Sequence, residues 1–275
     1  MPNSLHSSDA QALQKIIDKM WLDYTQLNPS AKKIYDSFVK EGEKVINDHV
    51  AYRTFNHKKL GVQSLAQHIE KYGYKPKNEY FFEQKKLRAQ HYEHPNKELP
   101  KIFISELELE KVEPFIAEEV EKLVDQVPMS LIQSEELLVC GRPWKLSHET
   151  YLKLADVSEY ASWVAAFGFR PNHFTVNVNA LQKYKDIQSV NQFVKSIGFD
   201  LNSSGGEIKG TPEELLEQSS TMAKEIQMSF TDGTFPVPAC YYEFAKRYKT
   251  PTGELYQGFI AKSADKIFES TNRAR

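Results

Sequence analysis

The sequence has little of several features that would place it in a specialised class of protein. Its 275 residues contain only two cysteines, Cys140 and Cys240, which are too few and too far apart for a disulfide framework or a zinc knuckle. No apolar run approaches the roughly 18 residues that a membrane-spanning helix needs, and the first residues show no basic segment followed by an apolar one. These absences predict a soluble, cytoplasmic protein with reduced thiols.

The sequence also lacks an excess of charge of either sign. It contains 35 lysines and arginines against 37 aspartates and glutamates, which gives a formal net charge of −2 at pH 7. This balance offers no electrostatic argument for nucleic acid or a membrane surface as a partner. With 40% hydrophobic and 26% charged residues, the composition is that of an ordinary globular protein with one large domain or two small ones.

The chain is organised around a strand-like segment at residues 47–55, with the sequence Asn-Asp-His-Val-Ala-Tyr-Arg-Thr-Phe. β-Branched and aromatic residues are frequent there, which favours a strand. Alternate side chains of a strand share a face, so His49 and Arg53 point the same way with small Ala51 between them. A neutral imidazole can bind a metal and a guanidinium can clamp a carboxylate. Taken alone, the segment fits a solvated edge strand equally well.

Hydrophobic periodicity and helix-capping signals predict further elements on either side of this segment. Helices are expected over residues 8–24, 31–45, 62–72 and 111–126, with a mostly helical block at 129–170. Strands are expected over residues 78–93 and 100–109.

The sequence predicts one strand–helix unit that is used twice. The segments at 62–73 and 187–198, each a predicted helix with its terminating glycine, share four residues at a constant offset of 125, and a histidine leads each unit. His49 lies 13 residues before the first helix and His173 lies 14 residues before the second. The matching pairs are Gln63/Gln188, Ser64/Ser189, Gln67/Gln192 and Gly73/Gly198. Chance can produce four identities, but the matched histidines favour a true internal repeat.

The second unit continues with a predicted helix and two strands. Residues 211–214, Thr-Pro-Glu-Glu, combine a cap, a proline at the first helical position and a capping-box glutamate. We expect this helix to end near Gln218, with a strand at 221–230 and a turn at 232–233.

An aromatic-rich strand at 239–248, which carries Glu243, is expected to close the second unit. Its counterpart in the first unit is the strand at 101–109, with Glu106 in the comparable place. The fold class is therefore predicted as α+β, with two tandem β-α-β-β-β modules that curl into a half-open barrel and with added N-terminal and central helices. The first and last strands of each module would line the resulting cup.

The predicted organisation is a single domain over residues 1–275. The first module occupies 47–110, a helical insertion occupies 111–170, and the second module occupies 171–262.

A mononuclear metal site in such a cup would take ligands from both opening strands and one closing strand, which selects His49, His173 and Glu243. Two histidines and one carboxylate with open positions form the facial triad of non-haem Fe(II) oxygenases, although manganese, cobalt and zinc also accept these donors. Glu243 also fits a rim position. We favour a rim position for Glu106, since a fourth protein ligand would leave fewer positions for substrate and oxygen.

Other polar residues can contribute to the same cup. Arg53 lies four residues beyond His49, roughly 13 Å along the strand, so it would suit the far end of a short dicarboxylate. Arg247 shares a face with Glu243 and is a second candidate, and residues 218–221 can offer hydrogen bonds. Four further histidines are expected at solvated positions, although the last two can approach the cup: His57, His68, His91 and His94.

Four motifs resemble the DUF1338 family, whose characterised members are 2-oxoadipate dioxygenase/decarboxylases, also called hydroxyglutarate synthases. The resemblance runs from about residue 10 to residue 272. The motifs are residues 47–55, 172–179 (Asn-His-Phe-Thr-Val-Asn-Val-Asn), 210–221 (Gly-Thr-Pro-Glu-Glu-Leu-Leu-Glu-Gln-Ser-Ser-Thr) and 241–248 (Tyr-Tyr-Glu-Phe-Ala-Lys-Arg-Tyr). This chain is shorter than the characterised bacterial members, which supply a further substrate contact late in their sequences.

The resemblance implies a vicinal-oxygen-chelate fold with one Fe(II). It assigns metal ligation to His49, His173 and Glu243, which makes the two histidines part of the substrate-binding site. It assigns catalytic substrate-carboxylate contact to Arg53. The implied reaction joins a small-molecule 2-oxo acid, 2-oxoadipate or a similar compound, with O2 to give 2-hydroxyglutarate and CO2.

Two other functions fit the same fold. A glyoxalase-type isomerase or lyase would use zinc, nickel or manganese as a Lewis acid and would consume no oxygen. A non-catalytic small-molecule binding protein would keep its ligand after metal removal. Metal content and oxygen consumption distinguish the three hypotheses.

Overall fold

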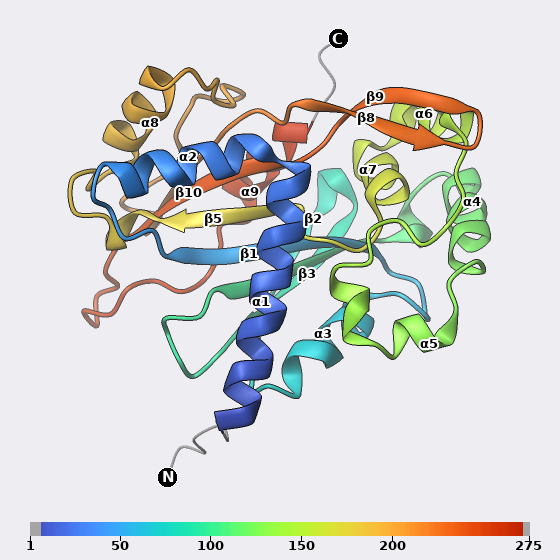
Figure 1. Cartoon of the computed structure of the whole chain (residues 1–275), viewed down its shortest axis with the longest axis horizontal. Helices are drawn as coiled ribbons and strands as arrows, with labels where there is room; N and C mark the ends of the chain where they lie inside the picture. Colours follow the sequence, from blue (N-terminus) through green and yellow to red (C-terminus); the bar gives the residue numbers. More distant parts are fainter. Residues whose placement is uncertain (1–6, 272–275) are drawn as a thin grey trace.

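The structure, a computed structural model, describes residues 7–271 (Figure 1). Its helices are α1 (Ser7–Leu27), α2 (Pro29–Lys40), α3 (Val62–Glu70), α4 (Pro114–Val124), α5 (Met129–Ile132), α6 (His148–Val157), α7 (Glu159–Phe167), α8 (Ile187–Ser196) and α9 (Ala261–Phe268). Its strands are β1 (Asn47–Phe55), β2 (Lys75–Phe82), β3 (Leu87–Glu93), β4 (Lys101–Leu107), β5 (His173–Asn177), β6 (Lys209–Thr211), β7 (Leu216–Ser220), β8 (Glu225–Phe230), β9 (Gly233–Pro238) and β10 (Tyr241–Arg247). Among these helices, none is both long enough and apolar enough to cross a lipid bilayer.

Eight strands form one mixed sheet in the order β2-β3-β4-β1-β5-β10-β7-β6, and β8 and β9 form a separate hairpin. In the first half, the opening strand β1 pairs in parallel with the closing strand β4. In the second half, β5 pairs in parallel with β10. The halves join where β1 and β5 pair antiparallel. This repeated topology confirms the predicted fold class, while the exact module boundaries stay a prediction.

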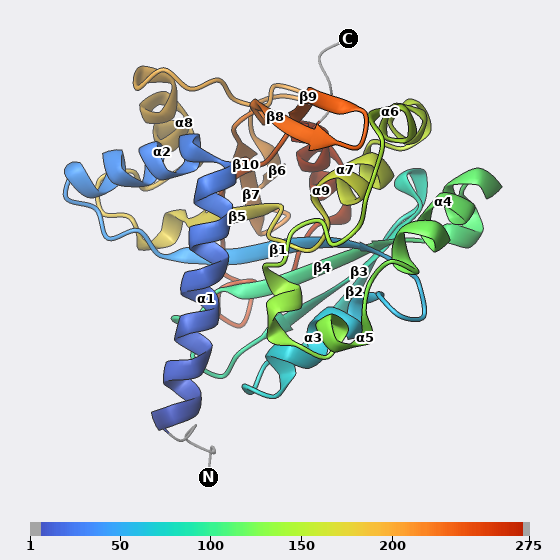
Figure 2. The same cartoon turned by 45° about the vertical axis from the view of Figure 1, so that its right-hand side comes forward.

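The sheet curls because one helix touches both of its edges. Helix α9 contacts β2 at one end of the strand order and both β6 and β7 at the other (Figure 2). Strands so far apart in a flat sheet could not share one short helix. The concave face is therefore a cup lined by the four central strands, and α9 lies across its mouth.

The outer face of the sheet is apolar and covered by helices. Helix α1 crosses this face beside β5, and α2 packs beside β10 (Figure 1). The ring of Phe174 on β5 lies 5.0 Å from Trp21 and 5.1 Å from Tyr24, both on α1. Such aromatic contacts supply much of the apolar burial that stabilises the fold. Because strand side chains alternate, this packing turns His49 and Arg53 toward the cup.

Two expected helical segments differ in the structure. Helix α2 ends at Lys40 rather than at Val45, because Gly42 adopts a φ of +87°, which ends the helical backbone. Residues 212–215 form a tight turn between the antiparallel strands β6 and β7, not the start of a helix. The hydroxyl of Thr211 accepts a hydrogen bond from the Glu214 backbone N–H, so the cap signal is real. The sheet pairing leaves no length for a helix.

The segment expected as one strand over 78–93 is two strands, β2 and β3. They are joined by a short turn in which Lys86 adopts a φ of +56°. The two strands pair antiparallel, so the break in the alternation marks a hairpin.

Candidate metal centre

Three predicted ligands meet at one point in the cup. His49 on β1, His173 on β5 and Glu243 on β10 each offer a ligand atom, and these atoms all lie within 4.8 Å of one another. Nε2 of His173 lies 3.2 Å from one Glu243 carboxylate oxygen, and Nε2 of His49 lies 3.5 Å from the other. All three side chains are buried. The structure therefore brings together the triad that the sequence predicts.

Strand register explains this convergence. His49 lies opposite Thr175 on β5, and Thr175 lies opposite Glu243 on β10, so the three form one rung across the sheet. His173 lies on the neighbouring rung, opposite Ala51. Two ligands on one rung and one on the next enclose a small volume on the concave face.

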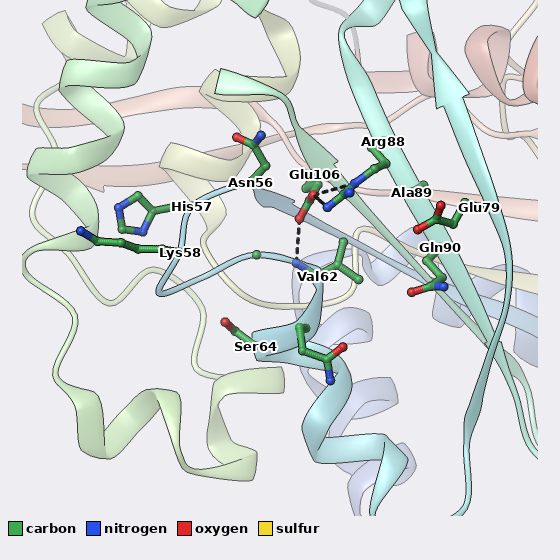
Figure 3. Close-up of a pocket in the computed structure, with 12 residues that line it drawn as sticks. Asn56, His57, Lys58, Val62, Ser64, Glu79, Arg88, Ala89, Gln90 and Glu106 are labelled. Carbon is green, nitrogen blue, oxygen red and sulfur yellow. Dashed lines mark hydrogen bonds and ion pairs between the residues drawn. The ribbon is translucent and has the colours of Figure 1, made fainter. Parts of the chain in front are cut away.

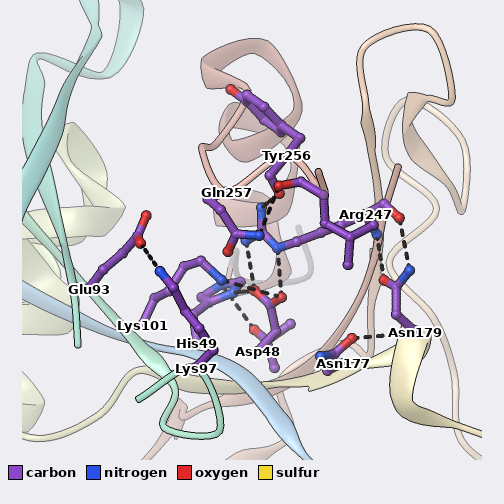
Figure 4. Close-up of polar contacts among 12 residues, drawn as sticks. Asp48, His49, Glu93, Lys97, Lys101, Asn177, Asn179, Arg247, Tyr256 and Gln257 are labelled. Atoms are coloured by element: carbon purple, nitrogen blue, oxygen red, sulfur yellow. Dashed lines mark hydrogen bonds and ion pairs between the residues drawn. The ribbon is translucent and has the colours of Figure 1, made fainter. Parts of the chain in front are cut away.

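A buried polar network fixes the His49 ring. Its Nδ1 lies 2.8 Å from Oδ1 of the preceding residue, Asp48. Arg247 grips the same carboxylate with two hydrogen bonds of 2.7 Å, from Nε to Oδ2 and from Nη2 to Oδ1 (Figure 4). The β1–β5 register shifts between Asn47 and His49, and such bulges re-aim side chains. With Nδ1 hydrogen-bonded to a carboxylate, Nε2 is the nitrogen that faces the cluster. It lies 3.0 Å from the Thr175 hydroxyl, a contact that a metal at this nitrogen would replace.

The His173 ring is held by a similar hydrogen bond and by an aromatic contact. Its Nδ1 lies 2.9 Å from Oδ1 of Asn172, again the preceding residue. The ring of Tyr241 stacks against it at a centroid distance of 4.5 Å and an angle of 25°. Both imidazoles therefore have a fixed orientation before any ligand binds.

The electrostatics of the cluster suit a cation. Burial lowers the pKa of His173 well below its usual value and lowers that of His49 despite the hydrogen bond to Asp48, so both rings are neutral ligands. Burial raises the pKa of Glu243 to about 8, although Gln218 donates to it at 2.6 Å. Two neutral nitrogens and a carboxylate that lacks a compensating charge fit one divalent metal ion.

Arg53 lies in the same cup, two residues beyond the rung of His173. It is 1% exposed. Its Nη1 donates to Glu159 at 2.9 Å and its Nη2 to Thr271 at 3.1 Å, while Nε has no hydrogen-bond partner within residues 7–271. Three aromatic rings lie 5.1–5.5 Å from the guanidinium carbon: Tyr160, Trp163 and Phe268. The guanidinium is thus held firmly, and Nε is its one buried nitrogen without a hydrogen-bond partner within residues 7–271.

Glu106 does not belong to the cup. It accepts a hydrogen bond from the Val62 backbone N–H at the start of α3 and two from Arg88, at 3.0 and 2.6 Å (Figure 3). It is 2% exposed, so the expected rim position is wrong. Glu106 is also not the counterpart of Glu243, as the sequence had suggested. It lies opposite Thr54 on β1, and Thr54 points to the face of the sheet away from the cup.

Several other expectations change in the structure. Arg247, a second candidate for binding substrate, donates hydrogen bonds to Asp48 and to the backbone carbonyls of Tyr256 and Gly258. Its role is therefore to position Asp48. The four histidines expected at solvated positions are all buried: His57, His68, His91 and His94.

Sequence reasoning missed part of the site. Asp48 and Asn172 precede the two histidines in both repeats, so their matched positions were a usable signal. Phe259, whose ring lies 4.8 Å from that of His49, comes from a loop with no repeat counterpart. Glu159 reaches Arg53 from α7, a long-range contact that no local pattern marks.

Comparison with known proteins gives a consistent result. The model of the 2-oxoadipate dioxygenase/decarboxylase family matches residues 7–254. The 2-oxoadipate dioxygenase/decarboxylases of rice and Arabidopsis thaliana are each 34% identical over 288 aligned positions, which cover 94% of this chain and 78% and 77% of those proteins. The plant relatives are named as chloroplastic, so the cytoplasmic location expected for this chain stays a prediction.

Solved structures agree on the fold. Rice hydroxyglutarate synthase in complex with 2-oxoadipate superposes with a TM-score of 0.93 and 32% identity, covering 98% of this chain and 95% of that chain. A Shewanella frigidimarina protein, provisionally described as a hydrolase, has a TM-score of 0.87 and 47% identity, covering 90% of this chain and 97% of that one. A glyoxalase superfamily protein from Ralstonia eutropha, at 19% identity and a TM-score of 0.68 over 84% and 80% of the chains, shows the shared fold alone.

Proposed function

Because the chain belongs to the 2-oxoadipate dioxygenase/decarboxylase family, we propose that it is an Fe(II)-dependent enzyme acting on 2-oxoadipate or a similar 2-oxo dicarboxylic acid. The reaction would consume O2 and give 2-hydroxyglutarate and CO2. All atoms are accounted for: one carboxyl group leaves as CO2, and both atoms of O2 enter the products. The observation that carries the proposal is the buried cluster of His49, His173 and Glu243 in a chain with these relatives.

The donor set supports iron as the metal. His49, His173 and Glu243 would hold Fe(II) on one side and leave the remaining positions for substrate and oxygen. Fe(II) bound there would supply the activation of O2 that oxidative decarboxylation of a 2-oxo acid requires. Asp48 and Asn172 would keep the two imidazoles in the ligating orientation.

The chain's own residues would position the substrate. The 2-oxo acid end belongs at the metal, and Arg53 would bind the distant carboxylate with its unused Nε–H. Between them lies Ala51, whose single methyl group leaves room for the carbon chain of the substrate. Holding both ends fixes the reacting carbon relative to the metal.

The cup would also exclude water during the reaction. Phe259 packs edge-on against His49, and it contacts Phe103 at a ring distance of 4.9 Å. An apolar cover of this kind strengthens electrostatic contacts inside the cup and protects a reactive site from side reactions.

Oxygen uptake tests the proposal directly. The protein would be purified without oxygen, loaded with Fe(II), and given 2-oxoadipate in an oxygen electrode. We expect equimolar consumption of O2 and formation of CO2 and 2-hydroxyglutarate. Bound iron with no oxygen uptake on any 2-oxo dicarboxylic acid would overturn the proposed reaction. Turnover without oxygen in the presence of zinc, nickel or manganese would favour an isomerase or lyase.

A further inference from the structure

One buried hydroxyl in the cup has no role in the site as described so far. Tyr241 on β10 is 0% exposed, and its hydroxyl has no hydrogen-bond partner within residues 7–271. A buried polar group left without a partner destabilises the folded protein. Buried polar atoms in native proteins nearly always have partners, so a ligand is a natural candidate for the missing one.

The register places Tyr241 between the metal cluster and Arg53. Tyr241 lies opposite His173, and His173 lies opposite Ala51, so the three share a rung. That rung is the one that separates His49 from Arg53 along β1. Tyr241 is also two residues from Glu243 on the same strand and shares its cup-facing side.

Contacts within the cup agree with this placement. The Tyr241 ring stacks on His173, which fixes the direction in which the hydroxyl points. Glu243 lies two residues along the same strand, and Arg53 lies two residues beyond Ala51 on β1, so both flank the Tyr241 ring on this face of the sheet. The hydroxyl therefore belongs to the space between the metal ligands and the guanidinium.

A second buried donor without a partner lies on the same face of the sheet, two residues beyond Ala51 on β1. Arg53 has committed Nη1 to Glu159 and Nη2 to Thr271, and only its Nε is unpartnered within residues 7–271. Glu159 offsets much of the positive charge of Arg53, so a carboxylate that arrives at Nε gains less from charge alone. A neutral second donor at that point would restore the lost affinity without adding charge.

We propose that the Tyr241 hydroxyl is a specificity-determining donor that, with Nε of Arg53, binds the substrate carboxylate farthest from the metal. The inference rests on the proposed function and deepens it. A 2-oxo acid without that carboxylate leaves two buried donors unpaired, and sites built to hydrogen-bond a group reject analogues that lack it. The two donors thus select dicarboxylic over monocarboxylic 2-oxo acids.

The test compares two tyrosines that differ mainly in the face they occupy. Tyr241→Phe removes the hydroxyl and keeps the ring on His173. Tyr242→Phe is the matched control, because its hydroxyl is also buried and unpartnered within residues 7–271. The Tyr242 ring, however, packs on the outer face, 6.1 Å from Trp21 and 6.4 Å from Tyr24.

The readout is anaerobic calorimetry with the Fe(II)-loaded protein, using 2-oxoadipate and 2-oxohexanoate, which has the same length without the second carboxylate. We expect Tyr241→Phe to weaken 2-oxoadipate binding about 10- to 100-fold, as the loss of one hydrogen bond to a charged group predicts. Binding of 2-oxohexanoate should change less than about twofold. Iron content and unfolding temperature should match the wild type, and Tyr242→Phe should change neither affinity.

Equal weakening of both acids by Tyr241→Phe would overturn the inference, because it would place the hydroxyl at the metal end. Unchanged 2-oxoadipate affinity would overturn it as well. In both cases the wild type still binds and converts 2-oxoadipate, so the proposed function survives. Failure of the iron-loaded wild type to bind 2-oxoadipate would overturn the proposed function together with the inference.

Discussion

Asp48 and Arg247 form a buried bidentate ion pair although 199 residues of chain separate them. Burial alone would raise the pKa of Asp48, but Arg247 and Lys101 outweigh it and hold the pKa well below its usual range. The charged carboxylate then accepts from Nδ1 of His49. A contact between the two halves thus sets the tautomer of a candidate metal ligand in the first half.

Replacement of Asp48 by Asn keeps an acceptor beside His49 but removes the charge. We expect metal affinity to fall about 10- to 100-fold, the usual effect of losing such an outer partner. The free energy of unfolding should fall by about 3 kcal/mol, since Arg247 loses its counter-charge. Chelator competition and urea unfolding measure the two effects. The mirror change, Asn172→Asp, adds a charge beside His173 and serves as the comparison; unchanged metal affinity in Asp48→Asn would contradict the assignment.

Removal of a ligand and removal of the substrate clamp should have separable effects. His173→Ala deletes one of three protein donors, so we expect iron binding to be abolished. Arg53→Ala should keep iron and lose affinity for dicarboxylates, because Glu159, its ion-pair partner, is partly exposed and can be hydrated. Metal analysis after dialysis and anaerobic substrate titration give both readouts. Full iron occupancy in His173→Ala would refute the ligand assignment.

The methyl group of Ala51 marks the space assigned to the substrate chain. Ala51→Leu would fill it, so we expect 2-oxoadipate binding to be lost while iron is retained. Overpacking itself costs about 1–3 kcal/mol of stability. Val50→Leu is the control, because it adds a methylene on the outer face of the same strand. Normal substrate affinity in Ala51→Leu would show that the substrate lies elsewhere.

Glu106 should matter for stability and not for the metal. Its carboxylate satisfies the Val62 N–H at the start of α3 and binds Arg88. Glu106→Ala should therefore lower the free energy of unfolding by about 2 kcal/mol. Glu106→Gln keeps an acceptor and should lose less. Iron content should be unchanged in both variants, and its loss would return Glu106 to the list of ligands.

His91 makes stability depend on pH. Burial is the main cause that lowers its pKa from 6.5 to about 4; Glu93 opposes this shift, and Arg247 and Lys101 contribute to it. The unfolded chain therefore binds the proton more readily, so this contribution is complete above about pH 6.5 and is lost as the pH falls toward 4, by at most about 3 kcal/mol. His91→Gln should flatten this part of the profile. Urea unfolding at about pH 7 and about pH 5 measures the difference; parallel losses in the two proteins would contradict the prediction.

The features of the fold and of the site that occur in both halves of the chain could be predicted from the sequence. The matched histidines and the constant offset between the two helices predicted the two modules, and the closing strand supplied Glu243. Strand alternation placed Arg53 on the face of His49. Strand parity acts over a few residues, and an internal repeat is found by comparing the sequence with itself, so neither signal requires knowledge of tertiary contacts.

Other features depend on contacts that local patterns do not encode. The Thr-Pro-Glu-Glu segment at 211–214 has genuine helix-capping chemistry, but strand pairing on both sides converts it to a turn. Arg247 was correctly placed on the face of Glu243, yet its guanidinium is used by Asp48. The partners of Arg53, Glu159 and Thr271, come from segments more than 100 residues away.

The pairing of β1 with β5, which joins the two halves of the sheet, also limits when the metal site can form during synthesis. His49 precedes Glu243 by 194 residues, the difference of their numbers, which is roughly 10–40 s of synthesis at about 5–20 residues per second. A nascent chain with only its first half holds one of the three donors, so the proposed metal would bind only after translation of β10 and the docking of the two halves. An ion bound at the proposed site would cross-link the two halves, and its removal would weaken their contact along β1 and β5 before either half unfolds.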